Sequence, residues 1–269
     1  MGNTPAQSVG SYLYGVTSRQ PFSGGKPFKA KGIAGQPVRI ITQGDLAAIV
    51  SDSPSEEYEV TLDNVRAHED VVEKVLQRTD VLPVSFGTVA TSDQDVQERL
   101  LGAEASAIHA QLQHIAGRVE MGVKALWEQP ALFAQIAAND PAIQRLRDEI
   151  SGTTVEETYD ARIELGELTD AAIQAQRAQD AEAILDYLGP LAVDTYTADI
   201  VTDMMILNAS FLVERNQASS FAQAVEALGQ ANRGRITLQS AGPLPPYNFV
   251  SVVVQLATPE EQPNSATTR

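Results

Sequence analysis

The sequence Arg118-Val-Glu-Met-Gly-Val-Lys-Ala-Leu-Trp127 begins the stretch of chain that decides the fold. Its apolar residues alternate with polar or small ones, which predicts a β-strand with one buried face. Residues 156–188 then carry apolar residues at helical spacing, interrupted by Asp170 and Arg177. We therefore expect a long helix with a bend or a solvent-facing middle, ended by the left-handed cap that Gly189 can supply.

The rest of this stretch predicts two strands, a helix and a last strand. Residues 191–198 and 204–213 are the two strands, and their short connection makes them antiparallel. Asn216 can cap the helix and Gly229 can end it. The order β-α-β-β-α-β is typical of the ferredoxin-like split unit, in which both helices lie on one face of a four-stranded sheet.

The other face of this sheet must meet water, another domain or another chain. We expect polar residues to point to it: Arg118, Glu120 and Lys124 from one strand and Arg235, Thr237 and Gln239 from another. An added strand over residues 249–256 needs burial on one side. It either joins a sheet edge or crosses back to the first domain.

The N-terminal part predicts a small antiparallel sheet with helices. Alternating or β-branched residues indicate strands at 12–16, 38–41 and 46–50, and a short strand at 81–84. Helical spacing covers 62–76, and Ser92 begins a capping box for a further helix. The fold class is therefore α+β with two domains, namely an N-terminal α+β domain (1–115) and a ferredoxin-like domain with a C-terminal strand (116–257), followed by a disordered tail (258–269).

The composition is that of a globular protein. The chain has 269 residues, of which 43% are hydrophobic, no cysteine and a formal charge of −16. No apolar run approaches the roughly 20 residues of a membrane helix, and the start of the chain lacks the features of a secretion signal. These two observations predict a cytoplasmic location. Because the negative charge repels phosphate groups, we expect neither nucleic acid nor membrane as a partner.

Positive charge is concentrated between residues 18 and 44. This stretch contains Arg19, Lys26, Lys29, Lys31 and Arg39, no acid, and several glycines and prolines. We expect a mobile basic loop. Two interpretations of its role stay open: a simple connection between strands, or a docking site that steers an acidic partner.

Residues for catalysis or metal binding are not grouped in the sequence. His109 and His114 are five residues apart on a helix and so face different sides. The side chains of His68, Glu69 and Asp70 diverge by about 100° each on a helix, so they cannot converge on one metal ion. We therefore expect them at solvent-exposed helix positions. No nucleophile elbow or complete phosphate-binding loop is present. We therefore expect no catalytic residues, no metal and no cofactor.

Three strings resemble the gas-vesicle GvpF/GvpL family. They are Val81-Leu-Pro-Val-Ser-Phe-Gly-Thr88, Asn208-Ala-Ser-Phe-Leu-Val213 and Gly242-Pro-Leu-Pro-Pro-Tyr-Asn-Phe-Val250. The opening at residues 12–16 and the strand at 120–124 are also similar to the family, so the resemblance spans nearly the whole chain in order. One departure is Ser85, where the family has a basic residue.

The resemblance implies a non-enzymatic accessory or minor structural protein of gas-vesicle assembly. It implies binding to the hydrophobic shell protein during nucleation or growth of the particle, and to other gas-vesicle accessory proteins. The family-motif positions, for which we expect structural roles, are Leu82, Pro83, Phe86, Gly87, Glu120, Lys124, Asn208, Gly242, Pro243, Pro245, Pro246, Tyr247 and Phe249.

Two hypotheses from other classes stay open beside this one. The first is a regulatory protein that binds small molecules, by analogy with other ferredoxin-like domains. The second is an acid–base hydrolase, which needs a concave pocket with two acids of different pKa. Nothing in the order of residues supports such a pair of acids.

Overall fold

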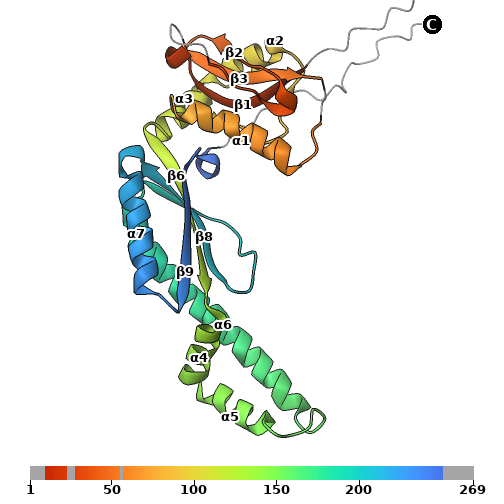
Figure 1. The fold of residues 1–269 in the computed structure, drawn as a ribbon, viewed down its shortest axis with the longest axis vertical. Helices are drawn as coiled ribbons and strands as arrows, with labels where there is room; N and C mark the ends of the chain where they lie inside the picture. Colours follow the sequence, from red (N-terminus) through yellow and green to blue (C-terminus); the bar gives the residue numbers. More distant parts are fainter. Residues whose placement is uncertain (1–9, 23–27, 55–56, 251–269) are drawn as a thin grey trace, which may run out of the picture. The chain divides into compact units, whose positions relative to one another are not determined.

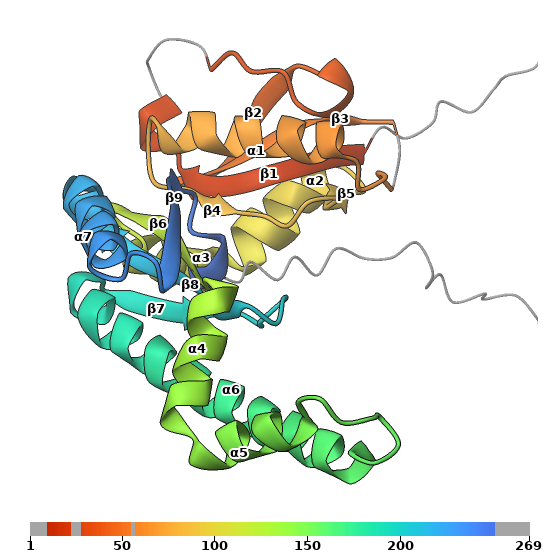
Figure 2. The ribbon, with the colours of Figure 1, turned by 60° about the horizontal axis from the view of Figure 1, so that its bottom comes forward.

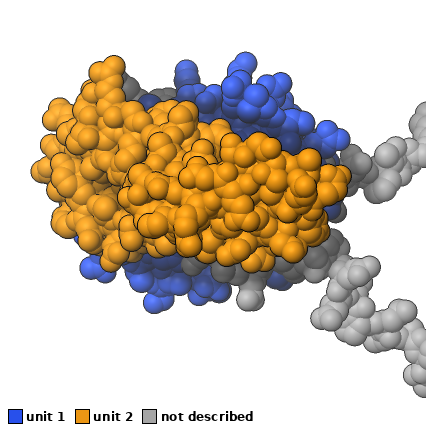
Figure 3. Space-filling model, turned by 90° about the horizontal axis from the view of Figure 1, so that it is seen from below, with its two compact units in different colours: residues 1–118, 245–269 blue, residues 119–244 orange. Residues whose placement is uncertain are grey.

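The computed structural model describes residues 10–22, 28–54 and 57–250 (Figure 1). The chain forms two compact units: unit 1 comprises residues 1–118 and 245–269, and unit 2 comprises residues 119–244 (Figure 3). Unit 2 is therefore inserted between two parts of unit 1. The expected tail at 258–269, and residues 251–256 of the expected added strand, lie outside the described residues.

Unit 1 is built on an antiparallel sheet, which confirms the prediction. Its strands are β1 (Gly10–Ser18), β2 (Val38–Gln43), β3 (Leu46–Ser53), β4 (Leu82–Pro83) and β5 (Val89–Ala90). The strand order is β2-β3-β1-β4, and β5 also pairs with β1. All but the two end residues of β1 are buried, because this central strand has neighbours along both edges and packs on both faces.

Helical segments lie on both faces of the sheet in unit 1 (Figure 2). Tyr12 and Tyr14 of β1 contact His68 on α1 (Leu62–Leu76). Leu13 belongs instead to a buried cluster with residues of η3 (Val96–Ala103) and α3 (Ala105–His114). The shorter segments are η1 (Gln20–Phe22), η2 (Ile33–Gly35) and α2 (Asp93–Asp95).

The predicted capping of the helix after Ser92 is confirmed. The Ser92 side chain accepts a hydrogen bond from the Asp95 N–H at 3.2 Å. The segment that follows is a π-helix over η3, however, and not the α-helix that the apolar spacing suggested.

Unit 2 contains a four-stranded sheet in the order β7-β8-β6-β9. Its strands are β6 (Arg118–Trp127), β7 (Asp194–Thr197), β8 (Met205–Glu214) and β9 (Ile236–Leu244). β9 has one more residue than β6 between Ala241 and Leu244, which is a β-bulge. Within the described part of the chain, β7 and β9 are the edge strands of this sheet.

The helices of unit 2 include the two that were predicted. α6 (Tyr159–Leu188) and α7 (Ala218–Ala231) contact each other and β8, so they share one face of the sheet. α4 (Gln129–Asn139) and α5 (Pro141–Ile150) come between β6 and α6, and Figure 2 shows α5 beside the first half of α6. The remaining short turns are η4 (Gly189–Leu191), η5 (Arg215–Gln217) and, in unit 1, η6 (Tyr247–Phe249).

Three helix boundaries in unit 2 differ from the prediction. Gly189 has φ −54°, which is right-handed, so the chain continues into η4 instead of forming a left-handed cap. α7 begins at Ala218, after η5, rather than at a cap by Asn216. It also passes through Gly229 and ends at Ala231, because Gly234 with φ +81° makes the turn toward β9.

The expectation that Arg235 points away from the helices is wrong. Its guanidinium donates a hydrogen bond to the Asp180 carboxylate of α6 at 2.7 Å. The Trp127 indole N–H donates to the same carboxylate at 2.7 Å. Asp180 is buried, so these two donors replace the water that its charge would lose.

Candidate functional site

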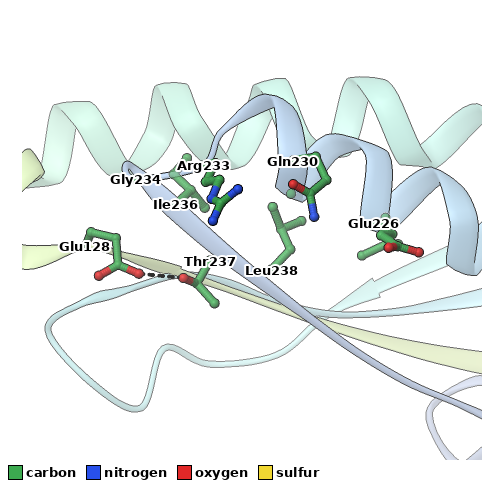
Figure 4. Close-up of a pocket in the computed structure, with 10 residues that line it drawn as sticks. Glu128, Glu226, Gln230, Arg233, Gly234, Ile236, Thr237 and Leu238 are labelled. Atoms are coloured by element: carbon green, nitrogen blue, oxygen red, sulfur yellow. Dashed lines mark hydrogen bonds between the residues drawn. The ribbon is translucent and has the colours of Figure 1, made fainter.

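Unit 2 has an open groove between α7 and β9, with a volume of about 600 Å³ (Figure 4). One wall is α7 and the other is the start of β9, where Thr237 donates a hydrogen bond to Glu128 at 2.6 Å. Figure 4 shows Glu226 and Arg233 well separated along the groove. The groove therefore presents charges at separate places and not a pair of converging acids.

One side of α7 lines this groove. Glu226, Gly229 and Gln230 stand at i, i+3 and i+4, so they share that side, and Arg233 follows just beyond the end of the helix. A Cβ on Gly229 would lie 3.8 Å from the Leu238 Cβ, which is ordinary contact. Glycine inside a helix costs about 1 kcal/mol relative to alanine. Since an alanine Cβ would fit at position 229, packing within the unit does not explain why this position is glycine.

The sequence interpretation missed this groove. It assigned Gly229 to the end of the helix, which hid the stripe that continues to Arg233. The helical spacing of Glu226, Gln230 and Arg233 was the available signal.

A second surface of unit 2 is apolar. Six large hydrophobic side chains between residues 187 and 201 are 41% to 68% exposed, and we call them the β7 apolar surface: Tyr187, Leu191, Val193, Tyr196, Ile200 and Val201. Tyr196 lies on β7, an edge strand whose four residues are all exposed, and the other five lie in the chain segments just before and after this strand. Exposed apolar side chains along a sheet edge mark an interaction surface.

The first turns of α6 also expose apolar side chains. Tyr159 is 62% exposed and Ile163 is 46% exposed. The solvent-facing part of this helix therefore includes its beginning, although the sequence placed it in the middle.

The basic residues singled out in the sequence fall into different environments. Lys29 and Lys31 are exposed. Arg19 donates a long hydrogen bond of 3.4 Å to the Gly44 carbonyl. Lys26 lies outside the described residues.

The stretch from residue 28 to residue 43 is not one mobile loop, so that expectation is wrong for this part. It contains η2, an isolated bridge between Lys31 and Pro37, and β2. Ile33 in η2 is almost completely buried. Lys29 and Lys31 are therefore presented from a segment that is fixed to the core of unit 1.

Arg39 is paired within unit 1. Its guanidinium bonds to both carboxylate oxygens of Asp93 at 2.7 Å and to Asp52 at 3.0 Å. Burial on its own raises the pKa of Asp93, but hydrogen bonds from Arg39 and Ser11 outweigh burial, and the pKa is lowered. The positive charge of Arg39 is thus paired with acids of the same unit, whereas a residue that steers a partner needs an unpaired charge.

Unit 1 contains a buried network of tyrosines and histidine. The Tyr12 hydroxyl accepts a hydrogen bond from the Gly87 N–H at 2.9 Å and lies 3.0 Å from His68 Nδ1. The Tyr14 hydroxyl accepts from the Ile33 N–H and pairs with the Ser51 hydroxyl, both at 2.9 Å. Burial raises the pKa values of Tyr12 and Tyr14, so both stay protonated.

The expectation that His68 is exposed to solvent is wrong. It is only 2% exposed, and burial lowers its pKa to about 4. The imidazole is therefore neutral at pH 7, and its Nδ1 shares a hydrogen bond with the Tyr12 hydroxyl. The helical spacing of His68 with the buried residues Val72 and Val75 was the signal that could have revealed its burial.

The family-motif positions of the first string contact unit 1 itself. Leu82 and Pro83 form β4 and pair with β1. Gly87 bonds to Tyr12, and the Phe86 ring lies 6.4 Å from the Tyr12 ring and 6.0 Å from the His68 ring. These contacts hold the string along β1.

The motif positions on β6 and β8 differ in exposure. Glu120 is 4% exposed and accepts a hydrogen bond from the Ser210 hydroxyl at 2.7 Å. Lys124, on the same strand, is exposed. Asn208 donates a weak hydrogen bond of 3.4 Å to the Asp199 carbonyl.

The last string crosses from unit 2 into unit 1. A Cβ on Gly242, which has φ +139°, would lie 2.7 Å from the Met121 sulfur, so only glycine fits there. The peptide bond from Gly242 to Pro243 is cis. Beyond Leu244, Pro245 and Pro246 are buried, and Tyr247 and Phe249 are half-buried in η6.

The described residues contain neither a cluster of metal-binding side chains nor a helix that could span a membrane. No three His, Cys, Asp or Glu side chains come together there as a metal ion requires. In the same part of the chain, no helix combines the length and apolar character needed to cross a bilayer.

The fold and its surfaces define an α+β protein of two units, in which unit 2 carries an open groove and an exposed apolar sheet edge. The model of the family "Gas vesicle synthesis protein GvpL/GvpF" matches residues 10–251. The chain therefore belongs to this family, and the resemblance seen in the sequence is confirmed. Membership supports a role in gas vesicle formation.

Individual relatives agree with this assignment. The chain is 35% identical to gas vesicle protein F of Streptomyces sp. (strain CB03234) over 90% of its own length and 100% of the relative. It is 28% identical to gas vesicle protein L of the same organism over 90% and 92% of the two chains. The crystal structure of the gas vesicle protein GvpF from Anabaena sp. PCC7120 superposes with a TM-score of 0.77 at 26% identity, covering 90% of this chain and 98% of that one.

Proposed function

We propose that this protein is a non-enzymatic accessory or minor structural component of gas-vesicle assembly that binds the hydrophobic shell protein while the particle nucleates or grows. The observation that carries the proposal is the β7 apolar surface. An edge strand surrounded by exposed Val193, Tyr196 and Val201 suits contact with an apolar polypeptide, because burial on binding removes these side chains from water. The protein then acts in the cytoplasm, at the gas vesicle.

The absence of enzymatic activity is part of the proposal. Tyr12, Tyr14 and His68 have shifted pKa values, but all three are buried in unit 1, where a substrate cannot reach them. The groove of unit 2 is accessible, yet its Glu128 already accepts the Thr237 hydroxyl. These placements favour contact with another protein over bond-making.

We assign the ferredoxin-like topology to unit 2 as part of the same proposal. The support is the strand order β7-β8-β6-β9 and the placement of α6 and α7 on one face. α4 and α5 are then an insertion into the first β-α connection. Lys29 and Lys31 of unit 1, with Arg19 nearby in the sequence, are the proposed steering charges for an acidic partner surface.

Co-expression of the tagged full chain with the shell protein of the same genome tests the proposal. We expect the shell protein to be captured, and the double variant Val193→Glu/Tyr196→Glu to lower capture by at least about tenfold. The matched control is Gln179→Glu/Gln223→Glu, which adds the same two charges at exposed polar positions on helices of the same unit. Absence of any complex with the unaltered chain would contradict the proposed function.

A further inference from the structure

Among the described residues β9 pairs with β6 along one edge only, and its other edge has a defined set of outward backbone groups. The Glu128 N–H donates to the Arg235 carbonyl at 2.9 Å, and the register then places Leu126 opposite Thr237. Hydrogen-bonded pairs alternate in an antiparallel ladder, so residues 235, 237 and 239 bond to β6 while residues 236, 238 and 240 direct their N–H and C=O groups outward. The Ile236 N–H agrees, since it donates to the Asn232 carbonyl.

We infer that β9 of a second copy of this chain occupies this edge. In an antiparallel pair centred on Leu238, Leu238 of one copy lies opposite Leu238 of the other, and Ile236 lies opposite Ser240. The two Leu238 residues exchange N–H···O=C bonds, and each Ser240 N–H donates to the Ile236 carbonyl across the interface. The pairing uses outward groups only, so neither β6–β9 ladder is disturbed.

The charges of the groove are self-complementary under this arrangement. Glu226 lies on α7 and Arg233 lies two residues beyond its end, and β9 from Ile236 to Ser240 spans about 13 Å. Arg233 lies toward the Ile236 end of the groove and Glu226 lies away from it (Figure 4). A twofold axis through Leu238 reverses the second copy, so each Arg233 meets the Glu226 of the other copy.

The open middle of the groove fits a second copy as well. Gly229 faces Leu238 of its own β9, and without a side chain there the groove stays open above the strand that the second copy would join. A twofold interface closes on itself and stops at two copies. The formal charge of −16 on each chain opposes unspecific association, so the contact has to be complementary.

Sedimentation equilibrium of the full chain between about 1 and 200 µM tests the inference. We expect a monomer–dimer equilibrium, weakened at least about tenfold by Arg233→Glu and by Glu226→Arg, because each creates two like-charge contacts. The double variant Arg233→Glu/Glu226→Arg should restore the dimer to within about threefold of the unaltered chain. The control Arg145→Glu, an exposed charge reversal on α5, should leave it unchanged.

A second pair of variants tests the backbone contact. Ser240→Pro removes an outward N–H and should abolish the dimer, whereas Ser240→Ala should not. Circular dichroism shows whether each variant is folded. If Ser240→Pro is unfolded, the charge-reversal variants of Arg233 and Glu226 decide the outcome.

Four results would overturn the inference. The first is a monomer at every concentration. This includes the case in which Arg233→Glu or Glu226→Arg instead abolishes capture of the shell protein. The second is a dimer that is indifferent to the charge reversals, and the third is a double variant that stays monomeric. The fourth is loss of the dimer on truncation after Val250, which would show that the residues after Val250, and not the edge of β9, hold the two copies together.

Discussion

Unit 1 and unit 2 place their polar and apolar groups in opposite ways with respect to solvent. In unit 1 the hydroxyls of Tyr12 and Tyr14 are completely buried and bonded to partners within the unit. In unit 2 apolar groups are left outside: of the twelve strongly exposed large hydrophobic side chains among the described residues, only Val60 and Leu62 belong to unit 1. The difference teaches that unit 1 is specified by its own interior, while unit 2 leaves apolar surface exposed, as the proposed binding of another chain requires.

The most damaging change to the interior of unit 1 should be Gly32→Ala. The new Cβ would lie 1.8 Å from the Tyr14 hydroxyl oxygen, so the network has to move, at a cost of about 3 kcal/mol or more. Urea unfolding measures the loss. In a Tyr14→Phe background the same change should cost less, because the two substitutions share one contact. Additive effects would contradict the close approach of Gly32 and Tyr14.

Acid should destabilise unit 1 through His68. Its folded-state pKa of about 4 lies below the ordinary value of 6.5, so the unfolded chain binds more protons between these values. The contribution is complete above pH 6.5 and is lost as the pH falls toward 4, by about 2 to 3 kcal/mol. The unfolding free energy of His68→Phe should lack this part of the pH dependence. Identical slopes for both proteins between pH 6.5 and 4.5 would show that His68 is not buried as described.

A single hydroxyl should matter in unit 1 and not in unit 2. Tyr14→Phe leaves the Ile33 N–H and the Ser51 hydroxyl without this partner, at a cost of about 2 kcal/mol. The matched change Tyr196→Phe, on the β7 apolar surface, should alter stability by less than about 0.5 kcal/mol. Equal losses in thermal unfolding would erase the proposed contrast between the units.

The smallest effect expected is a gain. Gly166 lies inside α6, and a Cβ there would meet no atom within 4 Å. Gly166→Ala should therefore stabilise the chain by about 0.5 to 1 kcal/mol, since alanine is the better helix former. A loss of stability would mean that this part of α6 is packed more tightly than the structure shows. Together with Gly32→Ala, the same substitution then has opposite signs in the two units.

The sequence was most informative where a pattern is local. Alternation within single strands and helical spacing from 62 to 76 predicted β1, β3 and α1, and the side chain of Ser92 caps a helix as expected. The family strings predicted the family, because they span the chain in order.

The features that the sequence could not reveal depend on residues that are distant in the chain. The hydrogen bond of His68 is one example, because its partner Tyr12 lies 56 residues earlier in the chain. Arg39 looks available until Asp93, 54 residues later, is found bonded to it. Neither contact has a local pattern that spacing rules can detect.

The groove was missed for a different reason, which is an ambiguous residue. Gly229 is compatible with the end of a helix and with a gap in its side, and single-sequence reasoning favours the end because glycine is common there. Only the continuation of α7 to Ala231 distinguishes the two.

The insertion of unit 2 into unit 1 has a consequence for biosynthesis. Val250, near the end of the described chain, packs against the core cluster that Leu13 and Ile108 also join. A ribosome delivers all of residues 119–244 before it delivers this last contribution. Unit 2 therefore has its complete chain first, and unit 1 waits with its core open until residues 245–250 have been translated.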